Sequence, residues 1–99
     1  AKAAHDAAAA ERELQRALRA LSLSEVTVGR MPKGAPEKVV LAWWLRRRTT
    51  VSLRWVSGRL GMGHYSRVTQ AINRAGRRPG WKLNRIKRKL ARLETMNQA

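Results

Sequence analysis

The chain has 99 residues, of which 22 are lysine or arginine and six are acidic, so its formal net charge at pH 7 is +16. A single domain of this size buries a small core, which argues against an enclosed active site beside a binding surface. Cysteine is absent, which excludes disulfides and thiolate-bound metal. No apolar run approaches the ~18 residues of a membrane span. We therefore expect no membrane partner, no metal and no other cofactor.

The positive charge is confined to the last two thirds of the sequence. Residues 1–29 contain four basic and four acidic side chains, whereas residues 30–92 contain eighteen basic residues and one acid, Glu37. A net charge of about 2–8 keeps a small domain soluble, and a larger one-sided excess destabilises a fold unless a polyanion neutralises it. The charge therefore favours nucleic acid as the partner, and the absence of cysteine fits the reducing cytoplasm as the location.

Apolar spacing predicts about five helices and no strand. The first is expected over residues 2–21 and the second over about 36–48. The third is expected to run from a cap at Thr49, Thr50 or Ser52 to residue 60, and the last two are expected over about 64–75 and about 81–95. The second is apolar on both sides, which is typical of a central helix. Residues 27–35 are predicted to be a loop, because they contain Gly29, Pro32 and Gly34.

The predicted fold is all-α, a compact helical bundle that contains a helix-turn-helix. It is one domain with three parts: an alanine-rich N-terminal helix (1–24), the helix-turn-helix core (25–76) and a basic C-terminal helix (77–99).

Residues 52–72 have the helix-turn-helix pattern, because two short helices with inner apolar stripes are joined by a turn that contains Gly61. Ser57 lies four residues before this glycine, the common spacing. The inner positions of the second helix, from Val68 onward, come one residue later than in the strict pattern, so we expect a longer turn. An ordinary helical hairpin is the alternative.

The outer face of the second helix suits the edges of bases. With Val68 inward, steps of about 100° place polar and basic side chains outside, and none is acidic. Arginine pairs with guanine and asparagine or glutamine with adenine, and the N-terminal end of a recognition helix contacts base edges. The predicted base-reading residues are His64, Tyr65, Ser66, Arg67, Gln70, Asn73 and Arg74. Simple exposure to solvent is the alternative for each.

Basic residues around the motif are predicted to contact phosphates, which position a protein on DNA without reading sequence. Nine basic residues lie between Arg74 and Arg92 with no acid among them, and a solvated helix face is the alternative. The predicted phosphate contacts are Arg46, Arg47, Arg48, Thr50, Arg54, Thr69, Arg77, Arg78, Lys82, Arg85, Lys87, Arg88, Lys89 and Arg92. The apolar stripe of the last helix, from Leu83 to Leu93, either docks on this domain, which we favour, or forms a homodimer.

The four tryptophans allow two interpretations. Tryptophan at helical spacing is usually core, and we expect this for Trp44 and Trp55. For Trp43 and Trp81 the choice between core and a platform on which unpaired bases stack stays open.

Short segments over about residues 10–75 match the pattern of a known family, most densely over residues 49–64. They are Pro32-Lys33-Gly34, Lys38, Leu41-Ala42, Leu45-Arg46, Thr49-Thr50-Val51-Ser52, Trp55-Val56, Arg59-Leu60, Met62-Gly63-His64 and Val68. These residues resemble the C-terminal domain of REP-associated tyrosine transposases, and the shape is similar to the DNA-binding domain of the bacterial replication initiator. The resemblance implies a bacterial mobile-element protein whose separate, N-terminal catalytic domain nicks single-stranded DNA with a paired-histidine metal site and a tyrosine.

The catalytic pattern of that family is missing from this chain. The two histidines, His5 and His64, are far apart in sequence, and Tyr65 is not expected to be a nucleophile without a metal-binding pair. We therefore expect no enzyme but a sequence-selective module for duplex or hairpin DNA, associated with the bacterial nucleoid. The alternatives are an RNA-binding or non-specific basic protein and a transposase that itself nicks single strands.

Overall fold

The computed structural model describes the backbone of residues 2–98 and the side chains of residues 6–95. This part of the chain forms six helices and no strand. They are α1 (Lys2–Ala20), α2 (Glu25–Arg30), α3 (Pro36–Arg48), α4 (Leu53–Leu60), α5 (Tyr65–Arg77) and α6 (Gly80–Gln98). The all-α prediction is therefore confirmed, with one helix more than the five expected.

The additional helix is α2, and part of it lies in the segment 27–35, which was predicted to be a loop. The Ser24 hydroxyl caps it by accepting the N–H of Thr27 at 3.1 Å, and Glu25 places negative charge in its first turn, where the helix dipole favours it. Val28 is buried against the bundle. The loop prediction was wrong for residues 27–30 because a cap and one buried side chain outweigh the helix-weakening effect of Gly29.

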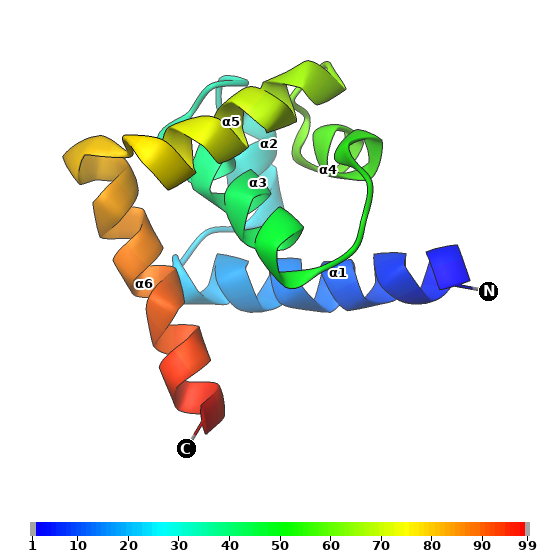
Figure 1. Ribbon diagram of the computed structural model, residues 1–99, viewed down its shortest axis with the longest axis horizontal. Coiled ribbons are helices and arrows are strands. Elements are labelled where there is room, and N and C mark those ends of the chain that lie inside the picture. Colours follow the sequence, from blue (N-terminus) through cyan, green and yellow to red (C-terminus); the bar gives the residue numbers. More distant parts are fainter. Residues whose placement is uncertain (1, 99) are drawn as a thin grey trace.

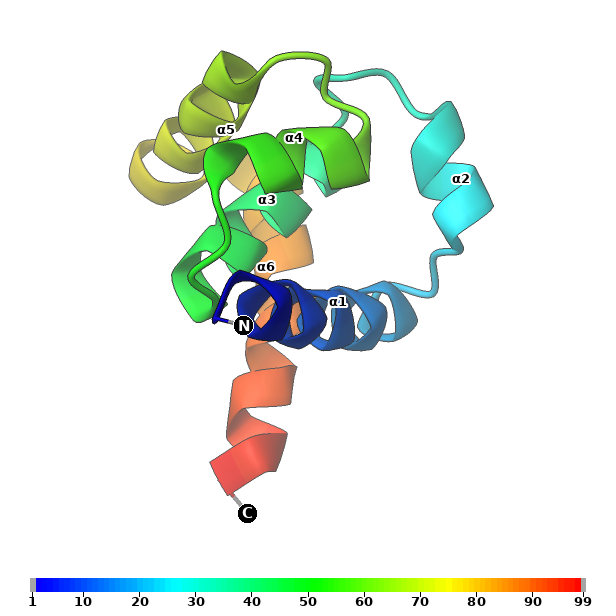
Figure 2. The ribbon, with the colours of Figure 1, turned by 90° about the vertical axis from the view of Figure 1, so that its right-hand side faces the viewer.

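Helix α3 is the centre of the bundle and contacts α1, α4, α5 and α6, as Figures 1 and 2 show. Pro36 begins it, since proline lacks the N–H that would have no partner in a first turn. Val40 on one side and Val39 on the other are both buried. This confirms the prediction of a helix that neighbours cover on both sides.

Helices α4 and α5 form the expected helix-turn-helix. Ser52 caps α4 with its hydroxyl, and Gly61 ends it with a φ of 64°, a left-handed conformation that glycine adopts without strain. The N–H of Met62 then bonds the carbonyl of Ser57 at 2.9 Å, which satisfies a carbonyl that the helix itself leaves free. The turn is thus fixed by its own hydrogen bonds.

Helix α6 leaves the end of α5 at a steep angle and contacts α3 and α1 (Figure 1). Leu83 and Leu90 are buried within the chain, and Ile86 and Leu93 are half-buried. The apolar stripe therefore docks on the same domain. Within the described residues, no helix combines the length and the apolar character needed to cross a lipid bilayer.

Candidate nucleic-acid interface

Helix α5 lies on the outside of the bundle with one face held against it (Figure 1). Val68, Ala71 and Ala75 are buried, because this stripe packs on α3 and α4. The opposite face is open to solvent. All seven residues predicted to read bases are exposed: His64, Tyr65, Ser66, Arg67, Gln70, Asn73 and Arg74. Thr69 on the flank is exposed too.

The residues at the start of α5 also shape the helix. His64 is the N-cap, and its Nδ1 accepts the N–H of Ser66 at 3.1 Å, which leaves Nε2 as the N–H donor of the neutral ring. Tyr65 stacks on the His64 ring at a centroid distance of 4.3 Å. The guanidinium of Arg54, from α4, lies 5.7 Å from the Tyr65 ring. Arg54 is therefore continuous with the exposed face of α5.

The loop between α2 and α3 brings a further cation to this face. A hollow of about 100 Å³ is lined by Lys33, Gly34, Val39, Met62, Arg67, Gln70, Ala71 and Arg74. Gly63 has a φ of 89°, and a Cβ there would lie 2.9 Å from Lys33 Nζ, so glycine allows the lysine to approach the turn. Sequence reasoning did not assign Lys33 to this face, because only the fold brings its loop to α5.

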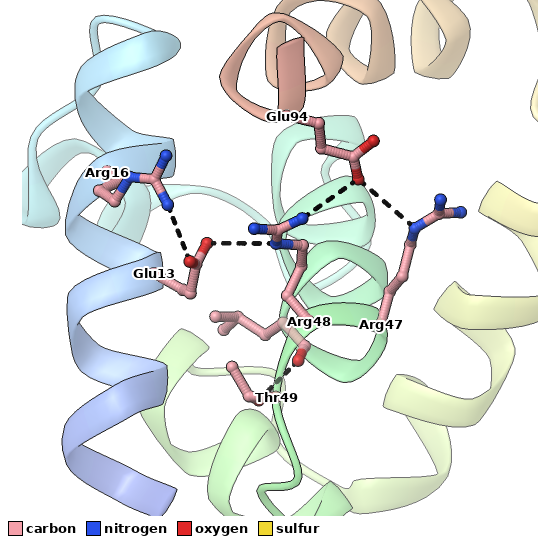
Figure 3. Close-up of polar contacts among 7 residues, drawn as sticks. Glu13, Arg16, Arg47, Arg48, Thr49 and Glu94 are labelled. Atoms are coloured by element: carbon pink, nitrogen blue, oxygen red, sulfur yellow. Dashed lines mark hydrogen bonds and ion pairs between the residues drawn. The ribbon is translucent and has the colours of Figure 1, made fainter. Parts of the chain in front are cut away.

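The arginines that end α3 are already engaged with other parts of the fold. The Arg48 guanidinium lies 3.6 Å from Glu13 of α1 and 3.5 Å from Glu94 of α6, and Arg47 lies 3.7 Å from Glu94 (Figure 3). Arg46 donates to a backbone carbonyl in the loop that follows α3. We do not include these three residues in the interface, although the sequence assigned them to phosphates.

Lys87 is also used by the fold. Its ammonium donates to the carbonyl of Ala75 at 2.7 Å, a group that has no intrahelical partner because residue 79 is Pro79. The same ammonium lies 4.5 Å from the centroid of the Trp43 ring, which is half-buried. Lys87 thus caps α5 and covers Trp43, so we do not retain it as a phosphate contact.

The remaining predicted cations divide into two groups, one at the junction of α5 and α6 and one farther along α6. Those at the junction with α5 are exposed: Arg77, Arg78, Lys82 and Arg85. Arg88, Lys89 and Arg92 are exposed farther along, and a rise of ~1.5 Å per residue places Arg92 about 15 Å beyond Lys82. Lys89 and Arg92 line a hollow with Arg16 and Arg19 of α1. Of these cations, Arg77, Arg78, Lys82 and Arg85 are the nearest in sequence to the end of α5.

Electrostatically, the molecule is divided. Among the described residues, every ion pair involves an acid of α1, α2 or α6, and none involves a residue of α5. Helix α1 lies across the bundle from α5 (Figure 1). We use the term basic face for the exposed residues of α5 together with Lys33, Arg54, Arg77, Arg78, Lys82 and Arg85.

Compared with known proteins, the chain matches no family model, no curated protein and no solved structure. In the part of the chain that the structure describes, no three His, Cys, Asp or Glu side chains gather closely enough to hold a metal ion. His5 lies outside the described side chains. The site is therefore defined by its own geometry.

Proposed function

We propose that this protein is a DNA-binding module that reads sequence with α5 in the major groove. The observation that carries the proposal is the division of α5 into a buried apolar stripe and an exposed face with no acid. That face presents Arg67 and Arg74, which suit guanine, and Gln70, which suits adenine. A groove about 12 Å wide admits a single helix of this kind.

Phosphate contacts come from the cations that the ion pairs leave free. Lys33 and Arg54 lie near the start of α5, and Arg77, Arg78 and Lys82 lie near its end. Cations at both ends of the helix match the two phosphate backbones that border the groove. If about five phosphates are neutralised, the logarithm of the binding constant falls with the logarithm of the salt concentration with a slope of about −4.5.

The resemblance to REP-associated tyrosine transposases supports the same proposal. In this proposal the chain recognises DNA and does no chemistry, and strand cleavage belongs to a separate catalytic domain that precedes it. The place of action is the bacterial cytoplasm, at the nucleoid. Duplex and hairpin stems are both candidate targets, because both present base pairs and phosphates.

Selection of bound sequences from a random duplex pool tests the proposal, followed by affinity measurements at several salt concentrations. We expect an enriched site bound at least ~10³-fold more tightly than random duplex. Equal affinity for the enriched site, random duplex and RNA would identify a non-specific basic protein instead. Cleavage of single-stranded DNA in the presence of a divalent metal would overturn the assignment as a non-enzyme.

A further inference from the structure

Trp81 is the most exposed large apolar side chain in the part of the chain that the structure describes. It is 70% exposed, compared with 1% for Trp44, whereas Trp43 and Trp55 are half-buried. An indole normally buries a large apolar area in a core or an interface. A single exposed apolar residue is common on protein surfaces, so its surroundings have to decide whether it marks a site.

The surroundings of Trp81 are cationic. Arg77, Arg78 and Arg85 are exposed nearby in the sequence, and Lys82 Nζ lies 5.7 Å from the centroid of the indole ring. A lipid surface would also suit cations beside an indole, but the apolar stripe of α6 is docked on the bundle and cannot insert with it. An aromatic ring among cations is the combination with which proteins bind nucleobases and their phosphates.

The position of Trp81 relative to α5 places it at the edge of the proposed DNA site. Helix α5 has 13 residues and is therefore about 20 Å long. The N-terminal residues of a recognition helix contact base edges, so in the proposed complex the C-terminal end of α5 lies toward the edge of the tract that is read. Trp81 follows four residues after Arg77 and so lies just outside the tract that α5 reads.

Beside the indole the surface is hollowed. The hollow has a volume of about 250 Å³ and is lined by Pro36, Glu37, Trp81, Lys82, Arg85, Ile86 and Lys89. This is less than the ~300–1,000 Å³ of a small-molecule pocket, and it suits one planar ring. Glu37 is the single acid in the lining, and a carboxylate accepts a hydrogen bond from an exocyclic amino group such as that of cytosine.

We propose that Trp81 stacks on one nucleobase that has left the helix next to the tract bound by α5, with Glu37 favouring a base that carries an amino group. This inference rests on the proposed function. The ligand is the face of a single base, and it has two sources: a base already unpaired in the DNA, or a base of an intact duplex that the protein displaces.

The test compares the wild-type chain with Trp81→Ala and Trp81→Phe, on the selected DNA as an intact duplex and with two unpaired bases beside the site. Val26→Ala is the matched control, because Val26 is 64% exposed on α2. Loss of stacking is expected to weaken binding by about 5- to 150-fold in Trp81→Ala, with most of the affinity kept in Trp81→Phe and all of it in Val26→Ala. The thermal midpoint of Trp81→Ala should equal that of the wild type.

A second measurement locates the base. 2-Aminopurine is placed in turn at each position beside the site, and we expect one position to change its emission when the wild type binds but not when Trp81→Ala binds. A loss confined to the DNA with unpaired bases identifies a base that is already unpaired. A loss on both DNAs identifies a displaced base.

The inference is overturned if Trp81→Ala binds both DNAs as the wild type does and no position responds, or if the substitution reduces binding to anionic phospholipid vesicles and not to DNA. If the wild type shows no preferred DNA site, the proposed function itself fails, and the inference with it. The role of Glu37 is tested separately. Cytosine at the responding position should bind about fivefold better than thymine, and Glu37→Gln should remove this difference. Equal binding of the two bases by the wild type excludes that role.

Discussion

Arg59 on α4 holds Glu11 on α1 through two parallel hydrogen bonds, Nε to Oε1 at 2.8 Å and Nη2 to Oε2 at 2.7 Å. The same guanidinium also donates to Glu25, at the start of α2. Paired contacts of this geometry are among the stronger ion pairs in proteins. They tie α4, the first helix of the helix-turn-helix, to α1 and α2, so Arg59 holds the motif in place and is not free for phosphate.

This ion pair predicts how stability depends on pH. The Arg59 guanidinium lowers the pKa of Glu11 from 4.5 to about 2, against the opposing effect of burial. The Glu11 carboxylate is protonated below about pH 4.5 in the unfolded chain but only near pH 2 in the folded chain. The ion pair therefore contributes its full stabilisation above pH 4.5, and this stabilisation is lost as the pH falls through 2. Because the Glu11 side chain is 41% exposed, we reduce the contribution for solvent screening to about 1 kcal/mol.

Glu11→Gln should therefore lower the free energy of unfolding by about 1 kcal/mol at pH 7, measured by urea denaturation, and the difference from wild type should disappear near pH 2. Asp6→Asn is the control, since no ion pair of Asp6 is found among the described residues and Asp6 lies outside the first turn of α1. Equal stability of Glu11→Gln and wild type at pH 7 would contradict the prediction.

Lys38 predicts a second dependence of stability on pH, which arises from the burial of a charged group and not from an ion pair. Its side chain is buried, with Nζ 3.3 Å from the carbonyl of Gly61. Burial, and then the charge of Lys33, lower the pKa of Lys38 below 10.5. The unfolded chain therefore binds this proton more tightly than the folded chain, so stability is reduced at neutral pH and recovers as the pH rises toward 10.5.

Lys38→Met removes the titrating group and keeps most of the volume. Urea denaturation at several pH values should show the wild type gaining stability relative to Lys38→Met between neutral pH and 10.5. A difference that does not change over this range would exclude the lowered pKa. The comparison is valid even if the loss of the hydrogen bond to Gly61 lowers the stability of the variant by a constant amount.

Two lysines of α6 should respond differently to the same substitution. Lys87→Met loses the hydrogen bond to the carbonyl of Ala75 and the contact with Trp43, so we expect the free energy of unfolding to fall by about 1.5–3 kcal/mol. The dependence of DNA binding on salt concentration should be unchanged. Lys82→Met should leave stability unchanged and flatten the slope by about one. The reverse pattern would show that Lys87 and not Lys82 contacts phosphate.

The sequence and the structure agree where local periodicity decides the outcome. The spacing of Val68 and Ala71 was enough to predict which face of α5 is open, and Leu83 and Leu90 marked the face of α6 that docks. Both are properties of one helix, because side chains three to four residues apart share a face.

What the sequence could not show are contacts between distant positions. Arg48 and Glu94 are 46 residues apart, and no spacing rule links them, so a count of charges assigned Arg48 to phosphate. Lys33 was overlooked for the same reason, since only the fold brings its loop to α5. The existence of α2 depended on whether Val28 found a core to enter.

The proposal that α5 reads bases is tested most sharply by Gln70, which is exposed at the middle of the open face and has no other role in the described contacts. Gln70→Ala should weaken binding to the selected site by about 1–3 kcal/mol and leave binding to random duplex unchanged, because a bidentate contact to a base is lost and no phosphate contact is. Arg67→Ala should also weaken binding to the selected site more than binding to random duplex. Some loss on random duplex is expected because a positive charge is removed. Both affinities are measured by fluorescence anisotropy at one salt concentration. Val26→Ala, on α2 and outside the basic face, is the control. If Gln70→Ala reduces both affinities equally, the middle of α5 does not face the bases, and the basic face binds DNA through its phosphates alone.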